Sequence, residues 1–355
     1  MKPLCLTELG QHVLDVINID EIPFVKGSPG IGKSAMYKWI ANELNLEFID
    51  FRLSMCDQTR LNGFPQFKNE RSFYAPPDIF PLEHDPLPEG KNGWLISFEE
   101  INSAVPSIQA IAYKILHDRM VGDYNLHPAV RLCANGNLDT DGAVVMPLSS
   151  ALASRMIQFH AVIKTDKWLK WAETSDKFHP LLLSYLQYRP EYIHRFNPKD
   201  KDSAYPCPRT HEKVSKLLYL IDKDKTRSYG SIRHSIEGAI GEVATQDFYA
   251  YLNYFKSVIP LKNIIANPFI NPPTDMGVRY ATLINAINNL SDDEDDIVNV
   301  ITHFEQRGGA DNDGYSIEYP SMILKKIMRK HRKLIMSTHF EFNNLLTKYK
   351  KYLVE

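Results

Sequence analysis

The sequence predicts an α/β protein, in which a parallel sheet flanked by helices is followed by a helical second domain. Short apolar runs alternate with amphipathic stretches up to Lys164, as expected for strands joined by helical crossovers. Beyond it, aromatic-rich helical segments begin at Trp168 and few stretches read as strands. We therefore expect an α/β domain over residues 1–165, a helical domain over 166–255 and a mainly helical C-terminal extension of unassigned role over 256–355.

The strands of the first domain can be placed in order. Each is a short apolar run, and the first leads directly into a glycine-rich loop. A helix follows this loop, because Met36, Ile40 and Leu44 recur every four residues and form one face. The five expected strands cover residues 22–26, 47–52, 93–99, 130–135 and 156–164.

One late helix can be predicted in detail. Ser291 is a candidate N-cap for the acidic run that follows it, because carboxylates are favoured at the positive end of a helix dipole. Gly308 and Gly309 are expected to end this helix. Its apolar stripe is Ile297, Val300, Ile301 and Phe304.

Composition limits the class of protein. The chain has 355 residues, of which 44% are hydrophobic, so it can form sizeable cores. With 41 Lys and Arg against 43 Asp and Glu, the net charge of −2 argues against a protein built to coat nucleic acid, although a local basic patch stays open. The four cysteines form no CxxC pair, and no stretch resembles a signal peptide or a membrane span. We expect a soluble, cytoplasmic protein that does not act at a membrane.

The glycine-rich loop has the spacing of a phosphate-binding P-loop (Walker A). The stretch GSPGIGKS fits G-x-x-x-x-G-K-[ST] and lies between a predicted strand and a predicted helix. Glycines let backbone N–H groups approach phosphate oxygens, Lys33 would reach the β and γ phosphates, and Ser34 would bind Mg²⁺. A chance glycine turn is the alternative, and the strand–loop–helix order disfavours it. The expected nucleotide-binding residues are Gly27, Ser28, Pro29, Gly30, Ile31, Gly32, Lys33 and Ser34.

A pair of carboxylates ends the third predicted strand, as a Walker B motif does. Glu100 is the candidate for polarising the attacking water, and Glu99 holds the position that contacts the metal, where aspartate is usual. The alternative is that both glutamates merely begin the next helix, where acidic residues are favoured. The combination of strand, carboxylates and P-loop favours a catalytic role.

The order of the downstream motifs resembles the MoxR-like group of AAA+ ATPases, bacterial and phage types included. The resemblance covers roughly residues 20–250. It implies that Asn137, in ANGN, is the sensor 1 residue that positions water, and that Arg155, in SALASRM, is an arginine finger acting on a neighbouring subunit. It also implies that Arg209, in PCPRTHEKV, is the sensor 2 residue of a helical lid, and that Arg119 is a further interface arginine.

Structural roles remain open for two of these arginines. Arg155 could be a charge at a helix C-terminus, and Arg209 could form a salt bridge on the lid surface. Their order after the P-loop and the acidic strand favours the functional interpretation, since an arginine stabilises charge that develops on a transferred phosphate.

Three other motifs carry less weight. Residues 311–314 resemble a calcium loop, but Gly309 and Pro320 occupy positions that need acids, so a turn is expected. The basic segment 325–333 is more typical of a solvated helix face than of a nucleic-acid contact. By the resemblance, residues 57–67 and 73–80, or the turn at 122–124, are candidate partner contacts facing the centre of a ring.

The sequence thus predicts an Mg²⁺-dependent ATP hydrolase. The resemblance implies a homo-oligomeric ring, a hexamer by analogy, whose active sites lie between subunits and which remodels a protein client or a von Willebrand factor A-type partner. The alternatives are a nucleic-acid-directed motor or restriction-type GTPase of the same fold, and a small-molecule kinase active as a monomer.

Overall fold

The computed structural model describes residues 2–141, 146–199, 204–224, 226–306, 315–316 and 318–353. Its contacts group the chain into two units. The first comprises Met1–Phe178 with Pro190–Gly241, and the second comprises His179–Arg189 with Glu242–Glu355. This grouping does not test the three domain boundaries expected from the sequence, which stay predictions.

The first unit contains a six-stranded sheet in the order β1-β10-β2-β9-β6-β3, in which every neighbouring pair is parallel. The predicted parallel sheet flanked by helices is confirmed, and the two-residue strand β1 is an addition that was too short to predict. The strands are β1 (Leu4–Cys5), β2 (Pro23–Lys26), β3 (Glu47–Arg52), β6 (Trp94–Glu99), β9 (Val130–Gly136) and β10 (Ile157–Val162).

Side chains alternate between the two faces of this sheet, and each face is covered by helices. Val25, Leu95 and Cys133 pack in one buried cluster with apolar residues of the helices α1 and α2. Their neighbours Phe24, Ile96 and Leu132 pack in a second cluster on the opposite face, with residues of α4. The helices are α1 (Leu6–Asn18), α2 (Lys33–Glu43) and α4 (Pro106–Asp118).

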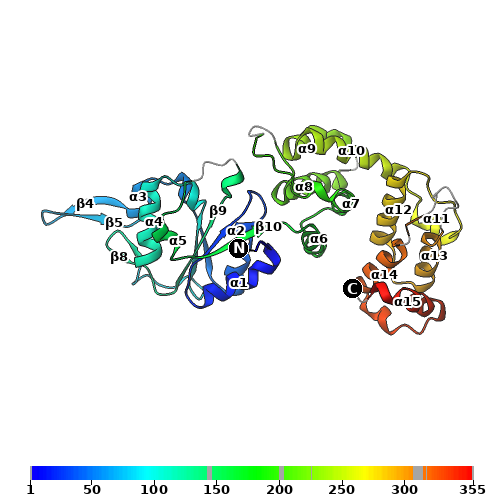
Figure 1. Cartoon of the computed structure of the whole chain (residues 1–355), viewed down its shortest axis with the longest axis horizontal. Helices are drawn as coiled ribbons and strands as arrows, with labels where there is room; N and C mark the ends of the chain where they lie inside the picture. The colour runs from blue at the N-terminus through cyan, green and yellow to red at the C-terminus, as the bar shows by residue number, and fades with distance from the viewer. Residues whose placement is uncertain are drawn as a thin grey trace. The chain divides into compact units, whose positions relative to one another are not determined.

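Smaller elements complete this unit. Figure 1 shows the β4–β5 hairpin extending away from the sheet. The hairpins are β4 (Phe64–Lys68) with β5 (Arg71–Ala75), and β7 (Met120–Val121) with β8 (Tyr124–Asn125). The remaining helices of the unit are α3 (Gln58–Asn62), α5 (Ser150–Ala153), α6 (Thr165–Thr174), α8 (Pro208–Lys223) and α9 (Arg233–Ile240). Short 3₁₀ helices cover Leu53–Met55, Ile101–Ser103, Asp139–Asp141, Pro190–Tyr192 and Tyr229–Ile232.

The second unit is helical in the part that the structure describes. Arg189 forms two hydrogen bonds with the carboxylate of Asp247, at 3.2 and 3.0 Å, and this pair joins two of its helices. The helices are α7 (Pro180–Tyr188), α10 (Glu242–Lys256), α11 (Leu261–Ala266), α12 (Met276–Asn289), α13 (Glu294–Phe304), α14 (Tyr319–Lys330) and α15 (Phe340–Leu353), with a 3₁₀ helix over Arg332–Met336.

The predicted late helix corresponds to α13, with one correction at its start. Asp293, rather than Ser291, is the N-cap, and its side chain accepts from the N–H of Asp296 at 3.1 Å. The predicted stop at Gly308-Gly309 and the turn at 311–314 lie outside the described residues. The four predicted stripe residues Ile297, Val300, Ile301 and Phe304 are all buried.

The basic segment near residue 325 belongs to α14. The apolar side of this helix is buried in the core of the second unit through Ile323, Leu324 and Ile327. No helix among the described residues combines the length and the apolar character needed to cross a membrane.

A buried histidine should make the stability of the first unit depend on pH. His211 of α8 is fully buried, and its Nε2 donates to the carbonyl oxygen of Tyr192 at 2.8 Å. Burial lowers its pKa from 6.5 to about 4, because an imidazolium would lose its hydration. Between pH 6.5 and 4 the unfolded chain therefore binds a proton at His211 that the folded protein does not bind. The contribution of His211 to the free energy of unfolding is complete above pH 6.5 and falls as the pH drops toward 4.

We expect acidification from pH 7.5 to 5 to cost about 2 kcal/mol at this site, measured as a lowered melting temperature. His211→Gln, which does not titrate but keeps an N–H donor, should lose this part of the pH dependence. His234→Gln is the control, because the His234 side chain is 98% exposed. Equal pH dependence in the His211→Gln variant and the wild type would contradict the prediction.

Candidate functional site

The P-loop connects β2 to α2 at the carboxyl edge of the sheet. Gly30 and Gly32 have φ angles of +77° and +111°, in the left-handed region that favours glycine. A Cβ on Gly27 would lie 2.8 Å from the carbonyl oxygen of Ala161 in β10, so only glycine fits between the loop and that strand. The predicted glycine spacing therefore has a steric cause at each of these positions.

Lys33 is buried inside this loop. Its Nζ donates to the carbonyl oxygens of Gly27 at 2.6 Å and Ser28 at 3.0 Å, and to Oδ1 of Asn137 at 3.4 Å. Burial lowers the pKa of Lys33 to about 8, and the carboxylate of Glu99 opposes this shift most strongly. A buried ammonium without a full counter-charge is well suited to bind an anion such as a phosphate.

Glu99, at the end of β6, reaches the P-loop directly. Its Oε2 accepts from the hydroxyl of Ser34 at 2.5 Å and its Oε1 from the hydroxyl of Ser97 at 2.7 Å. The longer side chain of glutamate therefore still reaches the position expected for a metal ligand. A carboxylate and a hydroxyl fit Mg²⁺, which usually binds one or two carboxylates together with substrate phosphates. Within the described residues, no three His, Cys, Asp or Glu side chains converge as a protein-only metal site.

Glu100 follows Glu99 at a sharp bend of the backbone. Its φ of +57° lies in the left-handed region, which is uncommon for a residue with a side chain. Its carboxylate accepts from the hydroxyl of Ser54 at 2.6 Å, and its N–H donates to Oδ1 of Asn135 at 3.2 Å. The side chain is thus held beside the end of β3, while Glu99 points to the P-loop.

Asn137 and Arg209 both lie against the P-loop, and their sensor roles stay predictions. Asn137 contacts Lys33 from the end of β9, and the N–H of Arg209 donates to the carbonyl oxygen of Gly30 at 3.3 Å. Cys207 lies at the N-terminus of α8 and is so close that a Cβ on Gly30 would lie 2.6 Å from its Sγ. The first turn of α8 therefore packs directly on the phosphate loop.

Arg155 lies apart from this group. Its Nη1 donates to the carbonyl oxygen of Ala151 at 3.0 Å, and its guanidinium lies 5.0 Å from the ring centroid of Tyr113. Its Nη2 is 3.5 Å from Nε2 of His117. In the part of the chain that the structure describes, no hydrogen bond or ion pair joins Arg155 to the P-loop or to the acidic pair.

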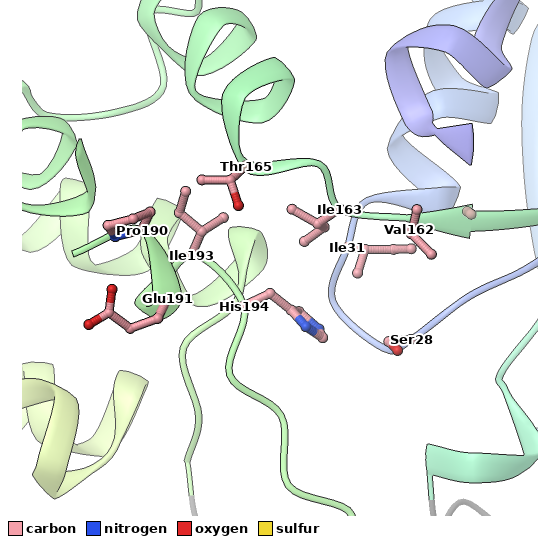
Figure 2. A pocket seen from close by; sticks show the side chains of 10 residues that line it. Ser28, Ile31, Val162, Ile163, Thr165, Pro190, Glu191, Ile193 and His194 are labelled. Carbon is pink, nitrogen blue, oxygen red and sulfur yellow. The ribbon is translucent and has the colours of Figure 1, made fainter. Parts of the chain in front are cut away.

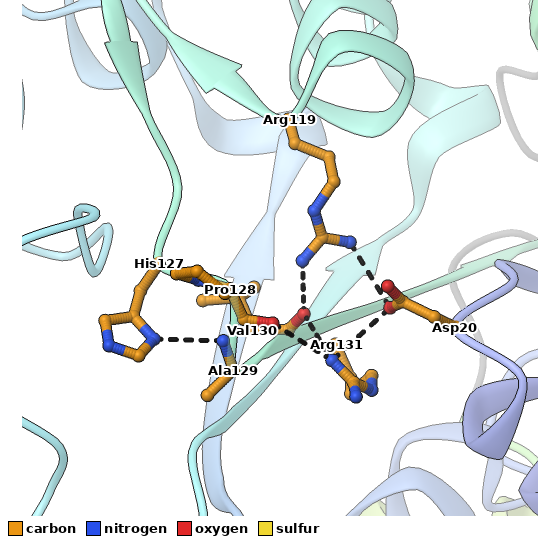
Figure 3. Close-up of polar contacts among 7 residues, drawn as sticks. All are labelled: Asp20, Arg119, His127, Pro128, Ala129, Val130 and Arg131. Carbon is orange, nitrogen blue, oxygen red and sulfur yellow. Dashed lines mark hydrogen bonds and ion pairs between the residues drawn. The ribbon is translucent and has the colours of Figure 1, made fainter.

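Arg119 lies at the amino end of β9, away from the P-loop, beside Asp20 and Val130 (Figure 3). It contacts Asp20 at 3.4 Å and donates to the carbonyl oxygen of Val130, at the start of β9. Arg131 also contacts Asp20 at 3.4 Å. These contacts join the end of α4, the turn after α1 and the amino end of β9, whereas the P-loop lies at the carboxyl ends of the strands.

A cavity of about 290 Å³ adjoins the P-loop (Figure 2). Apolar side chains line it from the loop, the end of β10 and the segment before α8, and His194 lies at its edge with Nε2 3.4 Å from the carbonyl oxygen of Pro29. Burial lowers the pKa of His194, so this side chain favours the neutral form. The apolar lining residues are Ile31, Ala161, Val162, Ile163, Pro190 and Ile193.

Sequence reasoning missed several residues of this site. Asp141 accepts from the hydroxyl of Ser28 at 3.2 Å and so joins the loop after β9 to the P-loop. Ser54, Asn102 and the cavity were also missed, and Asn135 was noted without a role. For Ser54, Asn102 and Asn135, the signal in the sequence was a position at or just after the carboxyl end of a predicted strand.

The parallel sheet, the P-loop between β2 and α2, the acidic end of β6 and the following helices together form an α/β fold of the P-loop type. No protein-family model and no curated protein sequence matches the chain.

Solved structures that are similar to the chain include two of NtrX and one of a candidate ATPase. NtrX from Brucella abortus is 14% identical, with 64% of this chain and 53% of that chain covered and a TM-score of 0.39. The chain thus spans about half the length of that protein. A candidate ATPase from Cytophaga hutchinsonii is 12% identical, with 98% and 90% covered and a TM-score of 0.33. NtrX in complex with ADP is 13% identical, with 93% and 67% covered and a TM-score of 0.39. The fold class rests on the sheet and P-loop of this chain rather than on these likenesses.

The contact between Gly30 and Cys207 yields a prediction. Gly30→Ala should weaken ATP and ADP binding about tenfold or more, because its Cβ would collide with Sγ of Cys207 and displace the loop. Adding Cys207→Ala should restore part of the affinity. Titration calorimetry measures both effects.

Gly90→Ala provides the matched control. Gly90 has a similar φ of +67°, but no atom lies within 4 Å of its would-be Cβ, so only backbone strain is added. Nucleotide affinity should be unchanged in this variant. Unaltered affinity in Gly30→Ala as well would refute the steric role of Cys207.

Proposed function

We propose that the protein is an Mg²⁺-dependent ATP hydrolase of the MoxR-like AAA+ type. It assembles as a ring and uses the energy of hydrolysis to remodel a protein partner. One observation carries the proposal: at the ends of β2, β6 and β9, the buried Lys33 contacts Asn137, and the hydroxyl of Ser34 contacts the carboxylate of Glu99, all at one P-loop.

The chain supplies the parts that phosphate transfer to water requires. Lys33 and the backbone N–H groups of the loop would bind the β and γ phosphates, and the adjoining cavity would hold the base against Ile31 and Ile193. Ser34 and Glu99 would hold Mg²⁺, which when bound neutralises phosphate charge. Glu100 would accept a proton from the attacking water, and Asn137 would orient that water by its amide.

Glu100 accepts the hydrogen bond of Ser54 through Oε2 at 2.6 Å, so its second carboxylate oxygen would be the one that takes a proton from water. The side chain can reach water by rotation about its χ angles.

The position of Arg155 supports a site shared between subunits. Its guanidinium packs on Tyr113 of α4 and, among the described residues, makes no hydrogen bond or ion pair with its own P-loop. A ring would let this arginine reach the nucleotide of a neighbour, where it is worth about 10³-fold or more in rate. We propose a homo-oligomer, hexameric by analogy, on this basis.

The β4–β5 hairpin supports a polypeptide as the partner. Phe64 and Phe67 are 66% and 82% exposed on it, and exposed aromatic side chains are typical of surfaces that bind other proteins. A client protein or a von Willebrand factor A-type partner would fit such a surface. The near-neutral charge of −2 makes nucleic acid the less favoured partner.

A mixing experiment tests the shared site. Arg155→Ala and Glu100→Gln should each reduce ATP turnover about 10³-fold when assayed alone. When the two are mixed in equal amounts, turnover should partly recover, because about a quarter of random interfaces in a ring pair an intact Glu100 with an intact Arg155. Steady-state phosphate release measures this.

Arg227→Ala, on an exposed loop, is the control and should keep full activity. Full turnover by Arg155→Ala would exclude the finger role, whereas loss without recovery on mixing would place Arg155 in the site of its own subunit. Absence of turnover in the wild type would overturn the proposed activity itself.

The metal role of Glu99 makes a separate prediction. Glu99→Gln keeps an oxygen near Ser34 but removes the negative charge, so the Mg²⁺ concentration for half-maximal turnover should rise by roughly tenfold or more. The Mg²⁺ dependence of ATP binding should shift likewise. Glu99→Asp, which keeps the charge, should be much less affected, and an unchanged Mg²⁺ requirement in Glu99→Gln would contradict the assignment.

A further inference from the structure

Two asparagines outside the assigned roles connect the ends of β6 and β9. Asn102 follows the acidic pair and is 2% exposed, and Asn135 lies within β9 and is 1% exposed. The side chain of Asn102 bonds to the backbone of Asn137, just after β9. The side chain of Asn135 bonds to the backbone of Glu100, just after β6.

Asn102 fixes both backbone groups of Asn137. Its Nδ2 donates to the carbonyl oxygen of Asn137 at 2.8 Å, and its Oδ1 accepts from the N–H of Asn137 at 3.0 Å. This pair of bonds needs one donor and one acceptor at the end of the side chain, which an amide supplies and a carboxylate does not. The side chain of Asn137 is in turn 3.4 Å from Nζ of Lys33.

Gly136 makes room for this contact. A Cβ on Gly136 would lie 2.3 Å from Oδ1 of Asn102, and the three atoms nearest to it all belong to Asn102. The φ angle of Gly136 is not positive, so its lack of a side chain serves close approach rather than backbone conformation.

Asn135 holds Glu100 in its unusual conformation. Its Oδ1 accepts from the N–H of Glu100 at 3.2 Å, at the residue whose φ is +57°. The Nδ2 of Asn135 is buried and has no hydrogen-bond partner among the described residues. Such an unsatisfied buried donor destabilises the folded state, so the amide is not explained by stability.

We propose that Asn102 and Asn135 are positioning residues for hydrolysis. Asn102 sets the place of Asn137, and Asn135 sets the backbone of Glu100. Together the two side chains fix the separation of the two residues that act on the attacking water. The inference rests on the proposed function, because it assigns a part in that reaction.

Asn102→Ala should separate catalysis from binding. Because the P-loop itself is intact, the affinity for ATP and ADP should stay within about threefold of wild type. The kcat should fall by roughly 10²-fold, since a small displacement of a catalytic group has effects of this size. Asn135→Ala should show the same split, and it tests the proposal independently if Asn102→Ala does not fold.

A double-mutant cycle adds a readout that general destabilisation does not produce. Gly136→Ala alone should lower kcat, because its Cβ displaces the Asn102 amide. In the Asn102→Ala background the same change should have little further effect, since the atoms that it would meet are gone. Asn92→Ala is the control: its exposed amide donates to the carbonyl oxygen of Leu44, so it removes a comparable bond elsewhere and should leave kcat unchanged.

The outcomes are distinct. Wild-type kcat in folded Asn102→Ala and Asn135→Ala would overturn the positioning role and leave the proposed ATPase intact. An equal loss of nucleotide affinity and kcat, or additive effects of Asn102→Ala and Gly136→Ala, would also overturn it. A wild-type protein that binds ATP without hydrolysing it would overturn the proposed function and the inference together.

Discussion

The buried ammonium of Lys33 is the interaction on which the site depends. A charge taken out of water must be compensated, and here the carbonyl oxygens of Gly27 and Ser28 and the amide oxygen of Asn137 share that task. These oxygens come from the loop after β2 and from the end of β9. The need to surround one cation therefore fixes how the two strand ends meet, while Gly27 and Gly30 leave room for Ala161 and Cys207 to pack against the loop.

The carboxyl edge of the sheet concentrates polar groups because parallel strands all end there. Apolar side chains fill both faces, so the polar residues can occupy only the strand ends and the turns that follow. Near the amino end of β9, Asp20 instead forms ion pairs with Arg119 and Arg131. Those pairs join elements of the fold and lie away from the phosphate loop.

Sequence patterns predicted the parts of the fold that repeat. The five longer strands and the amphipathic face of α2 follow from periodicity, and the P-loop follows from spacing that sterics impose. The cap of α13 was misplaced by two residues, because Ser291 and Asp293 both fit a start in a run of acids and only the backbone geometry selects Asp293. The two-residue strand β1 has no periodicity to detect.

The candidate site was predictable only for residues with a recurring motif. Lys33 and Ser34 contact Asn137 and Glu99, and Glu100 follows Glu99 directly, while the roles assigned to these residues stay predictions. Asn102, Asp141 and Ser54 make contacts with residues 35 to 113 positions away, and such pairs depend on how strand ends meet in space. The cavity combines residues of the P-loop, β10 and the segment 190–194, so no single stretch of sequence encodes it.

The contact of α8 with Gly30 has a mechanical consequence. The helix runs for 16 residues, which is about 24 Å at 1.5 Å per residue. Its first turn shares a hydrogen bond with the P-loop and is wedged there by Cys207. A helix is stiff along its axis, so a tilt of α8 about its contact with Gly30 would move Lys223, at the far end, by a larger distance than the first turn.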